Sequence, residues 1–81
     1  MEWLETASAV VAESAGCDPG DLKLSEGEKD ALLDASRVAA HTSGERINAP
    51  LICTVIGMAA AKTGASIESL ARLVESQGGD D

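Results

Sequence analysis

The sequence is almost without aromatic residues and is short of positive charge. It contains no Tyr and no Phe, and Trp3 is its single aromatic residue. A core without large rings has to be built from Leu, Ile, Val and Ala, and these side chains suit closely packed helices. Six Lys and Arg stand against fourteen Asp and Glu, which gives a formal net charge of −8. This balance argues against nonspecific binding to nucleic acid or to anionic lipid.

Cysteine is also scarce, with Cys17 and Cys53 as the two examples. Their positions form neither a CxxC motif nor a zinc-finger spacing, and two cysteines do not make a disulfide framework. Met1 is followed by Glu2 and Trp3 rather than by a basic segment and an apolar run, which predicts no secretory signal. We therefore expect a cytoplasmic protein without a metal or another cofactor.

Long hydrophobic runs are limited to one stretch, which has no charged residue between Arg46 and Lys62. A bilayer span needs about 20 predominantly apolar residues, and this stretch is shorter and is interrupted by Thr54 and Gly57. Residues 51–61 are therefore predicted to form a buried core helix, with Gly57 at a close approach of two backbones.

Four helical segments are expected in one domain, residues 1–76, with residues 77–81 as a flexible C-terminal tail. The predicted helices cover residues 3–15, 26–41, 48–64 and 67–76. Ser25 and Glu28 form a capping box at the start of the second, and Ser66 caps the fourth. The expected fold class is all-α, a compact four-helix bundle-like domain in which the third helix is central and buried.

The acidic character reverses locally between the second and third helices. Arg37 and His41 are one helical turn apart, and Arg46 lies in the loop that leads to Asn48, the expected N-cap, and Pro50. A helix N-terminus with basic side chains beside it attracts anions. The alternatives are that His41 only interacts with the helix dipole and that Arg46 only forms an ion pair.

Catalytic groups do not form a recognisable set. His41 is the only histidine, and no local spacing brings Cys17 or Cys53 beside it. Glu68-Ser69-Leu70 is superficially similar to the phosphopantetheine site of acyl carrier proteins, but carriers have two helices after that serine and Ser69 has only a short segment after it. An enzyme and a carrier are therefore the less favoured hypotheses.

The stretch LLDASRVAAHTSGERINAPLICTVIGMAA, residues 32–60, resembles a family of small all-helical domains of unknown function from actinobacteria. These domains occur alone or fused behind a nucleotidyltransferase of the kind that makes molybdopterin guanine dinucleotide. The resemblance implies an association with molybdenum cofactor maturation and a nucleotidyltransferase as partner. The chain departs from the family at Ile47 and Asn48, where small residues or Pro are expected, and it has no Gly-rich nucleotide loop of its own.

The sequence thus favours a non-enzymatic accessory or protein-interaction domain, with no nucleic acid and no membrane as partner. The alternative is a small ligand-binding domain that holds an anionic pterin or nucleotide near the start of the third helix. Both hypotheses use the same candidate binding residues, which are Arg37, His41, Arg46, Asn48 and Pro50. The oligomeric state stays open.

Overall fold

The computed structural model describes residues 2–77, and the regular secondary structure in that range is entirely helical. The elements in chain order are α1 (Glu2–Ala15), the 3-10 helix η1 (Pro19–Leu22), α2 (Glu26–Ser43), α3 (Asn48–Thr63) and α4 (Ile67–Gln77). The predicted all-α class and small helical bundle are confirmed. Of the predicted tail, Gln77 is the last residue of α4, and residues 78–81 lie outside the described range.

Local capping interactions explain where the helices begin and end. At the start of α2, the Ser25 amide donates to the Glu28 carboxylate at 2.7 Å and the Glu28 amide donates to the Ser25 hydroxyl at 3.1 Å, so the predicted capping box is present. Gly44 ends α2 and Gly64 ends α3, each at a positive φ that Gly adopts without steric cost. At the start of α4, the Ser69 amide donates to the Ser66 hydroxyl, as a cap at Ser66 predicts.

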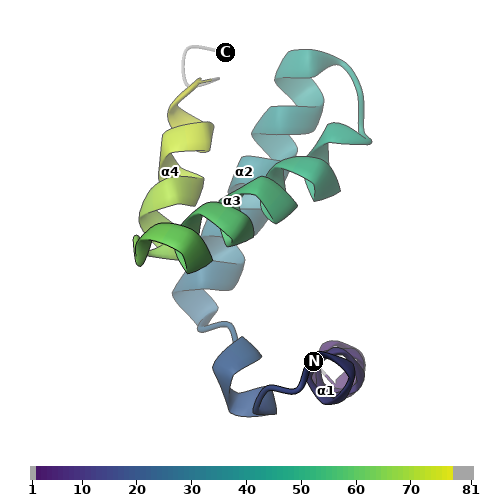
Figure 1. The fold of residues 1–81 in the computed structure, drawn as a ribbon. Helices are drawn as coiled ribbons and strands as arrows, with labels where there is room; N and C mark the ends of the chain where they lie inside the picture. Colours follow the sequence, from purple (N-terminus) through teal and green to yellow (C-terminus); the bar gives the residue numbers. More distant parts are fainter. Residues whose placement is uncertain (1, 78–81) are drawn as a thin grey trace.

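The core lies where α2 packs against both α3 and α4 (Figure 1). Three of its four fully or almost fully buried side chains are alanines, so the helices approach closely and leave little room for larger groups. The buried residues are Ala31, Ala35, Ile56 and Ala71, and the half-buried Leu32, Ile52, Ile67, Leu70 and Val74 pack around them.

The prediction that the third helix is central and buried is wrong, because α2 holds that position. Within α3 only Ile56 is buried, while Leu51, Val55 and Met58 are exposed. The cause is that α2 and α4 cover one side of α3, and no described part of the chain covers its other side. None of the helices between residues 2 and 77 combines the length and hydropathy needed to cross a membrane.

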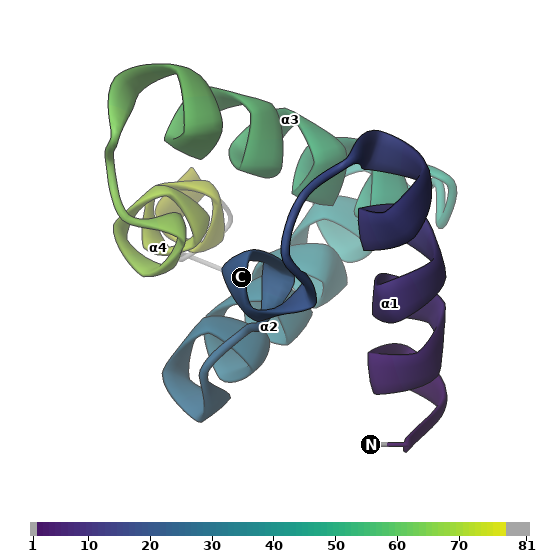
Figure 2. The same cartoon turned by 60° about the horizontal axis from the view of Figure 1, so that its bottom comes forward.

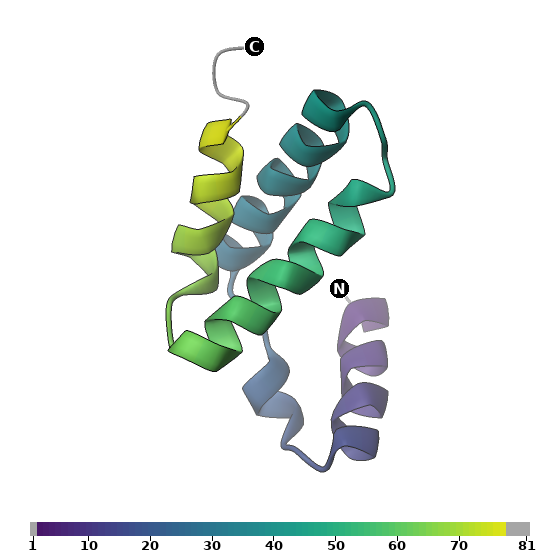
Figure 3. The ribbon, with the colours of Figure 1, turned by 45° about the horizontal axis from the view of Figure 1, so that its top comes forward.

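The first helix lies outside the bundle that α2, α3 and α4 form, whereas the expected bundle-like domain had four helices. Within residues 2–77, η1 is the element whose backbone lies close to that of α1, and the backbones of α2, α3 and α4 lie apart from it (Figures 2 and 3). The amides of Gly16 and Cys17 both donate to the Ala12 carbonyl, and the chain then turns into η1. This hydrogen-bonded turn directs α1 away from the core, and Trp3 is left 77% exposed.

Gly57 lies inside α3, and no described atom outside its own helix lies within 4 Å of the position that a Cβ would occupy. The expected close approach of two backbones at Gly57 is therefore wrong. Gly in a helix interior costs about 0.5–1 kcal/mol relative to Ala. We expect Gly57→Ala to stabilise the domain by about that amount and to raise its Tm by about 2–8 °C, as measured by circular dichroism.

Gly44→Ala is the matched control for Gly57→Ala, since the same methyl group is added to open space in both variants. Gly44 has φ +76°, a conformation that costs an L-residue about 1 kcal/mol or more. We expect Gly44→Ala to lower the Tm. A lower Tm for Gly57→Ala as well would show that its surroundings leave no room for a side chain.

Candidate functional site

Three of the predicted binding residues meet at one end of the bundle. Arg37 and His41 lie one turn apart on α2, and Arg46 lies in the loop between α2 and α3. Their side chains line one shallow surface depression together with Ala40 and Gly44. We call the three side chains the basic edge. The local fold explains their meeting, because the Gly44 cap reverses the chain just after His41 and returns Arg46 to the same end of α2.

Asn48 and Pro50 do not line this depression. The expectation that Asn48 caps α3 is wrong, because the N-cap position is Ile47, whose backbone is already helical, and no side chain caps it. The Asn48 side-chain amide instead donates to the Ser43 hydroxyl at 2.9 Å. Asn48 therefore ties the start of α3 to the end of α2, and Pro50 is an exposed residue of the first turn of α3.

The start of α3 offers few free amides to an anion. The Asn48 amide donates to the Glu45 carbonyl at 3.2 Å, the Ala49 amide donates to the Arg46 carbonyl at 3.1 Å, and Pro50 has no N–H. An anionic ligand at this position would depend on the side chains of the basic edge rather than on a helix N-terminus. The geometry thus gives little support to the pterin or nucleotide alternative.

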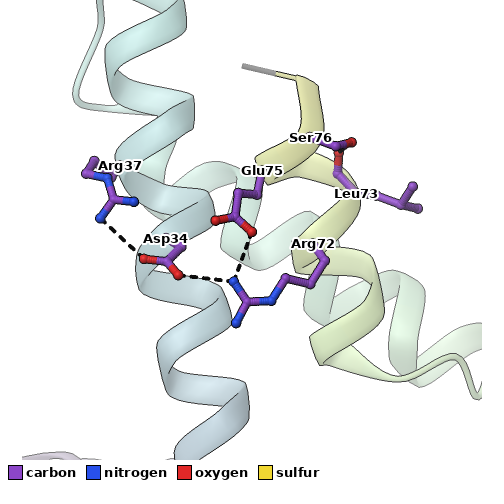
Figure 4. Close-up of polar contacts among 6 residues, drawn as sticks. All are labelled: Asp34, Arg37, Arg72, Leu73, Glu75 and Ser76. Carbon is purple, nitrogen blue, oxygen red and sulfur yellow. Dashed lines mark hydrogen bonds and ion pairs between the residues drawn. The ribbon is translucent and has the colours of Figure 1, made fainter. Parts of the chain in front are cut away.

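Arg37 of the basic edge also belongs to a network of ion pairs that connects α2 with α4 (Figure 4). Arg37 lies 3.3 Å from one carboxylate oxygen of Asp34, and Arg72 on α4 donates to the other oxygen at 3.0 Å. Arg72 also donates to Glu75 at 2.9 Å, and this bond, followed by the one to Asp34, raises the pKa of the Arg72 guanidinium. Asp34 therefore couples the basic edge to α4.

The contact between Asp34 and Arg72 is not predictable from the sequence, because the two residues are 38 positions apart and no local spacing connects them. The ion pair between Arg72 and Glu75, in contrast, was recognisable from the sequence. The two residues are three positions apart, and residues at that spacing are neighbours on a helix. Arg37 is 70% exposed at its side chain in spite of its ion pair. It remains accessible to a partner.

A cavity of about 270 Å³ lies between α1, η1 and the start of α2, and the sequence analysis did not predict it. Leu4, Leu22 and Leu24 give it an apolar lining, with Lys23 and Lys29 among its polar residues. The sequence signal for it was the pair of leucines, Leu22 and Leu24, in the otherwise polar connector between the first two long helices. Leu24 is half-buried, whereas Leu22 is still 38% exposed, so solvent reaches part of the apolar lining.

Both cysteines are free thiols in the described structure. Cys17 is exposed, while Cys53 is half-buried and its sulfur lies 3.1 Å from the Ser36 hydroxyl, in a hydrogen bond between α3 and α2. Ser69, the serine that was compared with the attachment site of acyl carrier proteins, donates its hydroxyl to the Ser66 carbonyl within the same helix start. Within residues 2–77, no group of three or more His, Cys, Asp or Glu side chains is placed to hold a metal ion.

The basic edge is thus the place where the structure brings predicted site residues together, and its guanidinium and imidazole N–H groups are hydrogen-bond donors that suit a negatively charged group. Its three side chains are exposed and come from two neighbouring segments. Comparison of the chain with protein-family models, with curated protein sequences and with solved structures finds no match.

Proposed function

We propose that the domain is a non-enzymatic, cytoplasmic accessory module that binds a protein partner through the basic edge. The observation that carries the proposal is that Arg37, His41 and Arg46 line one depression on a chain whose net charge is −8. The strong acidity elsewhere repels an acidic surface, so such a surface is directed to this end of the molecule. The binding segment of the partner is therefore acidic.

The resemblance of residues 32–60 to domains fused to molybdenum cofactor guanylyltransferases supports an enzyme of that class as the partner. Proteins that are fused in one organism and separate in another often act together, and the separate domain then has to bind in trans. The basic edge supplies charge and exposed donor groups for that binding. The domain itself contributes docking, and the chemistry belongs to the partner.

Arg46→Glu tests the basic edge, because Arg46 is its member in the loop and reversing its charge places an acid opposite an acidic surface. We expect the affinity for a purified molybdenum cofactor guanylyltransferase to fall by about tenfold or more. The measurement is calorimetry or biolayer interferometry at two salt concentrations, and the binding of the native domain is expected to weaken with added salt.

Lys23→Glu is the matched control, since it makes the same charge change at an exposed site beside η1, at the other end of α2. We expect its affinity to stay close to that of the native domain. Equal losses in both variants would assign the effect to net charge and exclude the basic edge. A native domain that does not bind the guanylyltransferase would exclude that enzyme as the partner.

A further inference from the structure

Two apolar helix faces are left uncovered in the described part of the chain. On α1, Trp3, Val10 and Val11 are 77%, 62% and 58% exposed, and we call them the α1 face. A second group of four large apolar residues begins just before α3 and continues along it. The residues are spaced by four, four and three positions, which places them on one side of the helix. This α3 stripe consists of Ile47, Leu51, Val55 and Met58, which are 50–65% exposed.

Single apolar residues scattered over a surface are normal and need no explanation. Here seven large apolar side chains are exposed in two groups, and grouped apolar residues of this kind mark contact sites. The charges indicate that the two faces fit each other. The sequence of α1 carries three glutamates and no base. Lys62 is the only charged residue of α3. An acidic amphipathic helix of the α1 type is therefore complementary to α3 in both charge and apolar character.

The α1 helix is held away from the α3 stripe of its own chain. The amides of Gly16 and Cys17 donate to the Ala12 carbonyl at 2.9 and 3.0 Å, and Ala12 is fully buried at this turn. The Asp18 carboxylate then accepts from the Gly20 amide at 2.9 Å and caps η1, which packs against α1. These bonds fix α1 against η1 and set the direction in which α1 leaves the turn, so in this structure the α1 face is presented away from α3 of its own chain and is free to meet a second chain.

We propose that two copies of this chain form a reciprocal dimer in which the α1 face of each copy lies on the α3 stripe of the other. Such a contact is isologous and closes on itself, so it yields a dimer rather than a filament. The inference goes beyond the proposed function, because it concerns the α3 stripe and not the basic edge.

The exposed area is sufficient for a dimer only if the contact is made twice. An exposed aliphatic side chain offers on the order of 100 Å² and an aromatic one about 150–250 Å², so the two faces together expose about 500 Å² in one chain. A reciprocal dimer buries both faces of both chains, or about 1,000 Å², which reaches the lower limit of area for a specific interface. A chain that covered its own α3 would bury half as much.

Sedimentation equilibrium of the full chain, from low micromolar to near millimolar concentration, tests the proposal. The expected particle has twice the 8.2 kDa chain mass at the upper end of the range. Val55→Glu places a charge in the middle of the α3 stripe and is expected to raise the dissociation constant by about tenfold or more. Leu33→Glu is the control, because Leu33 is 67% exposed on α2 and belongs to neither face.

Trp3 is the only aromatic residue, so its fluorescence reports on the α1 face directly. We expect its emission to shift to shorter wavelength as the native chain dimerises, to shift in the same way in Leu33→Glu, and to stay at long wavelength in Val55→Glu. Circular dichroism is expected to show the same helix content in all three proteins.

Two results would overturn the dimer. A particle of one chain mass at every concentration, with Trp3 emission at short wavelength throughout, would show that α1 covers α3 of its own chain. A dimer that persists in Val55→Glu would place the interface elsewhere. Neither result affects the proposed binding of an acidic partner, because that binding is measured with Arg46→Glu against a separate protein.

Discussion

Ile56→Ala is expected to destabilise the domain by about 2–5 kcal/mol, the range for removing three carbons from a buried aliphatic side chain. Ile56 is 3% exposed, and it is the only large side chain of the buried cluster, whose other members are alanines. Small domains have total stabilities of about 5–15 kcal/mol, so this loss leaves a large fraction of the chains unfolded near physiological temperature. Urea unfolding followed by circular dichroism at low protein concentration measures the loss.

Leu33→Ala removes the same number of carbons from a helix and serves as the control. Leu33 is exposed on α2, so its truncation is expected to change the free energy of unfolding by no more than about 0.5 kcal/mol. Ile56→Val should fall between the two variants, at about 0.5–1.5 kcal/mol. A loss for Ile56→Ala no larger than that for Leu33→Ala would mean that the contact of α3 with α2 and α4 contributes little to stability.

Ala71→Leu is expected to destabilise the domain by about 1–3 kcal/mol through overpacking. Ala71 is fully buried on α4, in the same cluster as Ala31 and Ala35 of α2. Three added carbons have no free volume there, so α4 has to move away from α2 and its other contacts weaken. The ion pair between Arg72 and Asp34 lies next to this contact and is displaced with it.

Ala61→Leu makes the same change at an exposed position of α3 and is expected to leave the stability within about 0.5 kcal/mol of the native value. The free energy of unfolding of both variants is measured by urea titration. A stable Ala71→Leu domain would contradict the close contact of α2 with α4. Loss of stability in both variants would instead indicate a general intolerance of leucine in these helices.

The candidate site was predictable where it depended on neighbouring positions along the chain. Arg37 and His41 share a face of α2 because they are four residues apart, and Arg46 follows the Gly44 cap closely enough to reach the same end. The role of Asn48 was not predictable, because Asn is both a good N-cap and a good side-chain donor. Its choice of Ser43 as acceptor depends on the exact geometry of the loop.

Whether the apolar faces of α1 and α3 are buried or exposed was also not predictable from the sequence pattern. Period and composition show that α1 and α3 each have apolar residues on a face, but not which faces meet in one chain. The uncharged stretch between Arg46 and Lys62 therefore predicted a buried helix, whereas Leu51, Val55 and Met58 are exposed. A face with no partner in its own chain has the same sequence pattern as a face in the core.

The sequence by itself determined the all-α class, the approximate helix ranges and two of the three predicted caps, since these depend on hydrogen bonds and side-chain spacings within a few residues. The capping box of Ser25 and Glu28 and the cap at Ser66 are the two examples. Only the tertiary structure decided that α2 is the central helix, that Asp34 pairs with Arg72, and that α1 stands apart. These features depend on the direction that the chain takes after the turn at Gly16 and on contacts between residues that are far apart in the sequence. The spacing of neighbouring residues carries no information about either.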